Sequence, residues 1–127
     1  MIQIGTKVRV SDNSGARYAS CIKILSGSKS QYAKIGDKIV VSITMLRAKR
    51  RAQSKVQKGK ISYGILVRSK KTKRSLKNTY ASYIENAIVL ITQQGKPIGS
   101  RVVGSVPRQL RYTKFMRIAT LAAGIIK

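Results

Sequence analysis

The sequence predicts a mainly β fold: a small five-stranded β-barrel with a projecting basic hairpin and a short C-terminal helical region. Short segments that alternate between apolar and polar residues predict the strands, and turn-forming residues separate them. The last of these segments is apolar on both faces, which is typical of a strand that closes a barrel. The 127 residues predict one domain, with the barrel over about residues 1–92 and the C-terminal loop and helices over about 93–127.

Two strands joined by a tight turn are expected at the start of the chain. The alternating apolar residues of the first strand are Ile2, Ile4, Val8 and Val10. Residues 11–15, Ser-Asp-Asn-Ser-Gly, are turn formers, and Gly15 is expected to adopt a positive φ. Such a turn also presents N–H groups suited to a phosphate, which is the less favoured interpretation. In the second strand, residues 16–25, one face is expected to carry Tyr18, Ser20, Ile22 and Ile24.

Three further strands follow. The clearest strand covers residues 39–46, where the alternating residues are Ile39, Val41, Ile43 and Met45. A partner strand covers residues 61–67, and its expected inward face is Ile61, Tyr63, Ile65 and Val67. Residues 85–92 are apolar on both faces and predict the strand that closes the barrel.

The C-terminal region is expected to hold a brief strand at residues 100–103 and two short helices. Residues 104–107 predict a helix start, with Pro107 at the first helical position and the helix itself at 108–112. Thr113 can cap a second helix. One face of this second helix is expected to carry Phe115, Ile118 and Ala122.

Charge dominates the composition. The chain has 27 Lys and Arg residues against 3 acidic residues, a net charge of +24, so its partner is expected to be a large polyanion. Nucleic acid and an anionic membrane surface both fit this description. The longest weakly polar run, residues 119–126, is far shorter than the ~20 residues that a membrane-spanning helix needs. No leader peptide is recognised at the start of the chain.

The basic residues concentrate in two segments on either side of the strand at residues 61–67. We call residues 47–60 the first basic loop and residues 68–74 the second basic loop. Because no acidic residue lies between Asp37 and Glu85, these loops are predicted to contact RNA phosphates. The predicted RNA-binding residues are Asn13, Ser14, Arg17, Arg47, Lys49, Arg50, Arg51, Lys55, Lys58, Lys60, Arg68, Lys70, Lys71, Lys73 and Arg74.

The sequence is poorly supplied for catalysis. It has no histidine, and its acidic residues, Asp12, Asp37 and Glu85, are scattered, so we predict no enzyme, no metal site and no cofactor. Cys21 is the single cysteine and is expected to be buried rather than reactive. Tyr18 and Tyr63 are in phase with core positions. Stacking on RNA bases stays open for Tyr80, Tyr83 and Tyr112.

Nine short segments, in order and spacing, resemble a known family. They are Met1-Ile-Gln3, Asp12-Asn-Ser-Gly-Ala16, Cys21-Ile-Lys-Ile-Leu25, Gly36-Asp37, Val67-Arg-Ser-Lys-Lys71, Glu85-Asn-Ala-Ile-Val-Leu90, Pro97-Ile-Gly-Ser-Arg101, Gly104 and Lys114-Phe-Met-Arg-Ile118. The family is universal large-subunit ribosomal protein fourteen, and the similarity runs from Met1 to about Leu121.

This resemblance implies a structural role on the large ribosomal subunit. The expected partners are large-subunit rRNA, small-subunit rRNA at intersubunit bridges, ribosomal proteins three and nineteen, and the ribosomal silencing factor. The resemblance assigns Ser100, Arg101, Lys114 and Arg117 to the face that meets the small subunit and the silencing factor.

Two other functions compete with this one. The chain fits a free barrel protein that binds single-stranded RNA, and a polybasic peripheral membrane protein is the third class. We expect a ribosomal location. Scarce acids and abundant Ile, Ser, Lys and Tyr favour a mitochondrial, organelle-encoded protein, with a bacterial cytoplasm or a plastid as alternatives.

Overall fold

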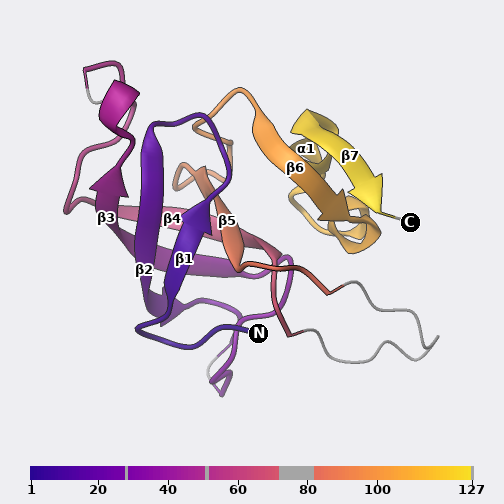
Figure 1. Cartoon of the computed structure of the whole chain (residues 1–127). Helices are drawn as coiled ribbons and strands as arrows, with labels where there is room; N and C mark the ends of the chain where they lie inside the picture. Colours follow the sequence, from indigo (N-terminus) through magenta and orange to yellow (C-terminus); the bar gives the residue numbers. More distant parts are fainter. Residues whose placement is uncertain (28, 51, 72–81, 127) are drawn as a thin grey trace.

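The computed structural model describes residues 1–27, 29–50, 52–71 and 82–126, and its main body is a closed five-stranded barrel (Figure 1). The strands are β1 (Lys7–Val10), β2 (Ala16–Ile24), β3 (Lys38–Leu46), β4 (Ile61–Arg68) and β5 (Ala87–Ile91). Consecutive strands pair antiparallel, and β1 closes the ring by pairing parallel with β5. The predicted barrel is confirmed.

A C-terminal layer lies beside this barrel (Figure 1). Its strands, β6 (Val102–Pro107) and β7 (Ala122–Ile126), form a parallel two-stranded sheet. Between them lie the 3-10 helix η2 (Arg108–Tyr112) and the helix α1 (Met116–Leu121). No helix in the described ranges is long and apolar enough to cross a membrane.

The buried side chains form two clusters. The barrel interior is filled by side chains from all five strands, among them Val8, Ala19, Ile39, Val41, Leu66, Ile88 and Leu90. The second cluster lies between the outside of the barrel and the C-terminal layer, and it includes Ile65, Val67, Val89, Ile91, Val106, Leu110 and Ile118. Strand β5 contributes to both clusters, because alternate side chains point to opposite faces of a strand. The prediction that this strand is apolar on both faces is therefore confirmed.

The predicted faces of two barrel strands are wrong. In β2 the buried apolar residues are Ala16, Ala19, Cys21 and Ile24, whereas Ile22 is 42% exposed. Register irregularities at Tyr18 and beyond Cys21 interrupt the alternation, and one extra residue transfers every later side chain to the other face. In β4 the side chain that joins the barrel interior is Leu66, while Ile65 and Val67 belong to the second cluster. Ile61, at the start of β4, is 64% exposed.

The C-terminal region departs most from prediction. The helix over residues 108–112 is present as η2, but residues 104–107 belong to β6 and Pro107 is the extended N-cap residue. The second helix begins at Met116 with Phe115 as its N-cap, so Thr113 is not its N-cap residue. The Thr113 hydroxyl nevertheless accepts from the main-chain N–H of Phe115 at 3.3 Å, and it donates to the carbonyl of Leu110 at 2.9 Å. Residues 122–126 form β7, where pairing with β6 outweighs the weak helical spacing.

Candidate nucleic-acid interface

The turn between β1 and β2 is built around a buried carboxylate. Asp12 is 0% exposed, and its side chain accepts hydrogen bonds from the N–H and hydroxyl of Ser14 and, at 2.9 Å, from the N–H of Leu90 in β5. Burial raises the pKa of the Asp12 carboxyl, and these hydrogen bonds together with the charge of Arg47 oppose the rise. One of the three acidic residues is thus removed from the surface.

Asn13, the next residue of this turn, bonds to the loop at residues 97–101, which is distant in sequence. The Asn13 carboxamide oxygen accepts from the main-chain N–H of Ser100 at 2.8 Å and of Arg101 at 3.2 Å. Its amide nitrogen donates to the Ser100 hydroxyl at 2.8 Å. The sequence placed Asn13 and Ser14 among RNA contacts, but Ser14 is 1% exposed and its hydroxyl bonds to Asp12. Both side chains have partners inside the fold.

The first basic loop is anchored to the same turn. The main-chain N–H of Arg47 donates to the carbonyl of Gly15, and that of Lys55 donates to the carbonyl of Ser14, both at 2.9 Å. Between them lies the short 3-10 helix η1 (Ala48–Arg50). Gly15 has a φ of +104°, as predicted for the turn, and an added Cβ would lie 2.5 Å from the Cβ of Ser54. The loop is therefore packed closely onto the turn at its base.

The structure describes most of the basic residues that were predicted to bind RNA, and most of those it describes are exposed to solvent. Those with exposed side chains are Arg17, Lys49, Lys55, Lys58, Lys60, Lys70 and Lys71. Arg47 is half-buried, because its guanidinium donates to the carbonyl of Asp12 at 3.2 Å. Arg50 ends η1, and Arg51, Lys73 and Arg74 lie outside the described residues.

Arg68 joins the second basic loop to the C-terminal layer. Its guanidinium donates to the carbonyl of Val103 at 2.9 Å, and it is half-buried. Burial lowers the pKa of Arg68, whereas the nearby Glu85 carboxylate acts in the opposite direction. Glu85 itself forms an ion pair with Arg9 at 2.9 Å. The position of Arg68 therefore indicates that its side chain links β4 to β6 of the C-terminal layer.

The face assigned by resemblance includes the loop at residues 97–101, which bonds to Asn13 in the turn between β1 and β2. Ser100, Arg101, Lys114 and Arg117 are all exposed. A pocket of about 430 Å³ lies here, lined by Lys96, Pro97, Gly99, Ser100, Arg117, Thr120 and Leu121. Arg117 of α1 and Ser100 of the loop thus line one depression, although they are distant in sequence.

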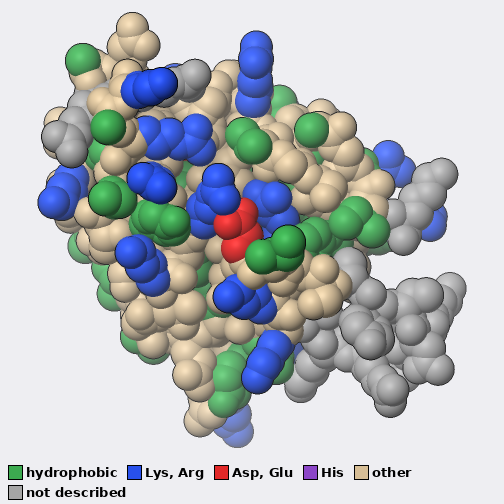
Figure 2. Space-filling view, in the orientation of Figure 1, with side chains coloured by type: hydrophobic (Ala, Val, Ile, Leu, Met, Phe, Trp, Pro, Cys, Tyr) green, Lys and Arg blue, Asp and Glu red, His purple; other side chains and the backbone are tan. Residues whose placement is uncertain are grey.

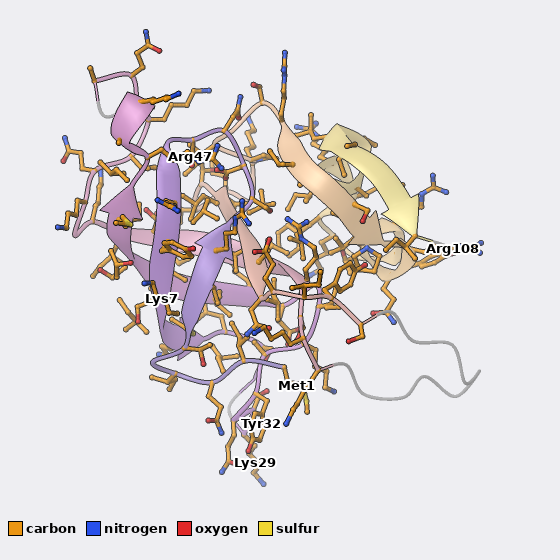
Figure 3. The ribbon with its side chains drawn as sticks, in the orientation of Figure 1. Met1, Lys7, Lys29, Tyr32, Arg47 and Arg108 are labelled. Carbon is orange, nitrogen blue, oxygen red and sulfur yellow. The ribbon has the colours of Figure 1, made fainter. Side chains whose placement is uncertain are left out.

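Positive side chains also extend beyond the two basic loops. Figure 2 shows Lys and Arg side chains scattered over the whole face in view, with little acidic surface among them. Lys7 is one that sequence reasoning missed. It lies over the ring of Tyr18, 4.5 Å from its centroid. Lys29 and Tyr32 are exposed in a loop at the end of the barrel away from Arg47 (Figure 3). Isolated cations in alternating strands and short loops give no charge run, so a search for clusters does not find them.

The described part of the chain contains no group of three His, Cys, Asp or Glu side chains that could hold a metal ion. Cys21 is buried as predicted, and burial raises the pKa of its thiol. What the described surface offers is therefore an array of cations on a closed, hydrogen-bonded scaffold.

Comparison with known families decides the identity of this scaffold. The family model for ribosomal protein L14p/L23e matches residues 1–126 of the 127. The chain belongs to the ribosomal protein L14p/L23e family. As a member of the L14p/L23e family it is a structural protein of the large ribosomal subunit, and the family is one of non-enzymes. The resemblance in nine short segments is confirmed over nearly the whole chain.

Proposed function

We propose that this protein binds large-subunit rRNA through phosphate contacts and contributes to intersubunit bridges during translation. The observation that carries the proposal is the fixed excess of surface cations, a net charge of +24 with Asp12 buried and Glu85 paired to Arg9. Such a surface repels itself unless a polyanion neutralises it. In a ribosomal protein, the polyanion that fits is RNA.

The two basic loops are proposed as the main rRNA contacts. The first loop, which carries the exposed Lys49, Lys55 and Lys58, is bonded to the turn at residues 11–15 through the main chains of Arg47 and Lys55, and this anchoring limits the conformational entropy lost on binding. Phosphate contacts position a protein on RNA without reading its sequence. The protein is therefore expected to hold RNA segments in place rather than to recognise single bases.

The face that contains Ser100, Arg101, Lys114 and Arg117 is proposed to meet the small subunit and the ribosomal silencing factor. Its pocket of about 430 Å³ and its exposed arginines support a contact with an anionic or acidic partner. Ribosomal proteins three and nineteen are proposed as neighbours. The composition favours a mitochondrial ribosome.

The first experiment removes charge from the first basic loop. Lys49, Arg50 and Arg51 are changed together to Gln, while Arg47 is kept because it also supports the turn. Binding to protein-free large-subunit rRNA is then measured against salt concentration. The slope of log K against log salt is expected to fall by roughly one unit for each lost phosphate contact.

A matched variant removes three exposed cations elsewhere, Lys23, Lys29 and Lys34, again by change to Gln. Its slope is expected to stay closer to that of the parent. If the slope of log K against log salt falls by the same amount in both triple variants, the first basic loop has no special role in RNA binding. Circular dichroism checks that both variants remain folded.

The second experiment tests the docking face. Arg101 and Arg117 are changed to Glu, with Arg108 and Arg111 of η2 changed to Glu as the matched control. The Arg101/Arg117 variant is expected to enter large subunits but to weaken both subunit joining and silencing-factor binding, because like charges repel. Gradient sedimentation at high and low magnesium separates incorporation from joining. Normal joining, or absence from large subunits, would contradict the assignment.

A further inference from the structure

Two surfaces proposed to contact partners are tied to a single five-residue turn, residues 11–15. The first basic loop bonds to one side of this turn and the loop at residues 97–101 bonds to the other. In Figure 3, Arg47 lies beside the start of β2, where this turn ends. Loops that extend from a barrel usually move independently of each other. Here the hydrogen bonds argue against that independence.

On the side of residues 97–101, the carboxamide of Asn13 holds two consecutive main-chain N–H groups, those of Ser100 and Arg101, as well as the Ser100 hydroxyl. The approach is close, since a Cβ added to Gly99 would lie 2.6 Å from the Asn13 carboxamide oxygen. The strand that follows is also fixed, because the N–H of Val103 donates to the carbonyl of Ser11 at 2.6 Å. The Arg101 main chain therefore has little freedom relative to the turn.

On the side of the first basic loop, the contacts come from both its ends. Arg47 uses its main-chain N–H on Gly15 and its guanidinium on the carbonyl of Asp12. Lys55 uses its main-chain N–H on Ser14, and its ammonium reaches across to the carbonyl of Ile98 at 3.2 Å. This last bond joins the two loops directly.

We infer that Asn13 is a positioning residue that fixes Arg101 relative to the first basic loop, so that large-subunit rRNA at the loop and small-subunit rRNA at Arg101 meet one composite surface. The inference rests on the proposed function, since it assumes that Arg101 meets RNA. Asp12, which anchors the turn, is fully buried, so its charge faces the fold and leaves the composite surface positive. A rigid array of cations loses less entropy on binding than two loops that must each be ordered.

The test uses large subunits that contain variant protein, with joining to small subunits followed by light scattering. The variants are Asn13→Ala, Arg101→Gln and the double variant. Asn13→Ala is expected to weaken joining by the same factor as Arg101→Gln, roughly two- to fivefold for one exposed contact. The double variant is expected to lose no more, because Asn13 acts through Arg101.

Two further variants separate positioning from general loss of stability. Thr6→Val is the matched control, since its hydroxyl also accepts a main-chain hydrogen bond, from Gln3 at 3.1 Å, away from this turn and from both basic loops. It is expected to join like the parent. Gly99→Ala places a methyl group against the Asn13 oxygen and is expected to weaken joining as Asn13→Ala does. Losses that multiply in the double variant, or normal joining by Asn13→Ala beside weakened joining by Arg101→Gln, would overturn the inference.

Hydrogen exchange of the free protein tests the positioning role of Asn13 separately from the docking face proposed above. In Asn13→Ala, the amides of Ser100 and Arg101 are expected to exchange at least about tenfold faster, while the Leu90 amide, held by Asp12, stays protected. If Arg101→Gln joins normally, the docking face is wrong and the exchange result alone decides whether Asn13 fixes the loop. Unchanged exchange at both amides would refute the positioning role.

Discussion

The barrel and the C-terminal layer are held together in different ways. In the barrel every strand has two hydrogen-bonded neighbours, and the ring is closed by the parallel pairing of β1 with β5. The C-terminal layer rests on the outside of β4 and β5 through apolar side chains, with main-chain links such as the Val103 N–H to the Ser11 carbonyl. Closure distributes stability around a ring, whereas a layer attached by one face can detach as a unit.

The largest effects are expected from truncating one fully buried isoleucine in each region. Ile88→Ala removes a side chain from the barrel interior, and Ile118→Ala removes one from the second cluster. Each is expected to cost about 2–5 kcal/mol of unfolding free energy. Ile88→Ala is expected to lower the protection of all five strands, and Ile118→Ala to expose the C-terminal layer first. Denaturant titration with hydrogen exchange measures both.

The contrast between the regions would fail if Ile118→Ala lowered the protection of β1 to β5 as much as that of β6 and β7. The two clusters would then unfold as one cooperative unit. Strand β5, which contributes to both clusters, is the element through which such coupling would pass.

An intermediate effect is expected at the turn that joins the barrel to the basic loop. Gly15→Val forces a β-branched residue to a φ of +104° and also meets the Cβ of Ser54, whereas Gly5→Val meets only the backbone strain of its φ of +86°. The strain costs about 1–3 kcal/mol at either site. We therefore expect Gly15→Val to have the lower Tm, by at least about 4 °C. Equal Tm values would show that Ser54 moves aside easily.

The smallest effect is expected at the ion pair between Arg9 and Glu85, at the closure of the barrel. Both side chains are substantially exposed, so Glu85→Gln is expected to cost about 0.2–1 kcal/mol at low salt and nearly nothing at high salt. Main-chain bonds, such as the Ser11 N–H to the Ile88 carbonyl, are expected to hold the closure instead. A larger cost that persists in high salt would show that this ion pair helps to close the ring.

How much the sequence predicted differs from one element to another, within the barrel as well as in the C-terminal layer. Residues 87–91 are apolar at every position, a pattern typical of a short strand buried on both faces, so β5 and the barrel were predictable. The faces of β2 were not, because its register irregularities give no distinct residue signal. Residues 122–126 carry small and apolar residues that suit either a helix or a strand, and their pairing with β6 decided between the two.

The candidate site was predictable as charge and not as geometry. The basic loops were evident from Lys and Arg spacing, whereas the roles of Asn13, Ser14 and Arg68 as internal joints depend on partners far along the chain. A polar turn residue that contacts a ligand and one that bonds to another loop have the same sequence pattern. Only the fold distinguishes them.

The parallel pairing of β1 with β5 also determines when the barrel can close during synthesis. Arg9 pairs with Ala87 and Val10 with Ile88, so the first strand made cannot find its closing partner until most of the chain exists. At about 5–20 residues per second, that interval lasts several seconds. During it, the edges of β1 and β4 that later pair with β5 stay open, and open edges invite aggregation. The dense positive charge of the nascent chain provides protection, because like-charged molecules repel one another until β5 closes the ring.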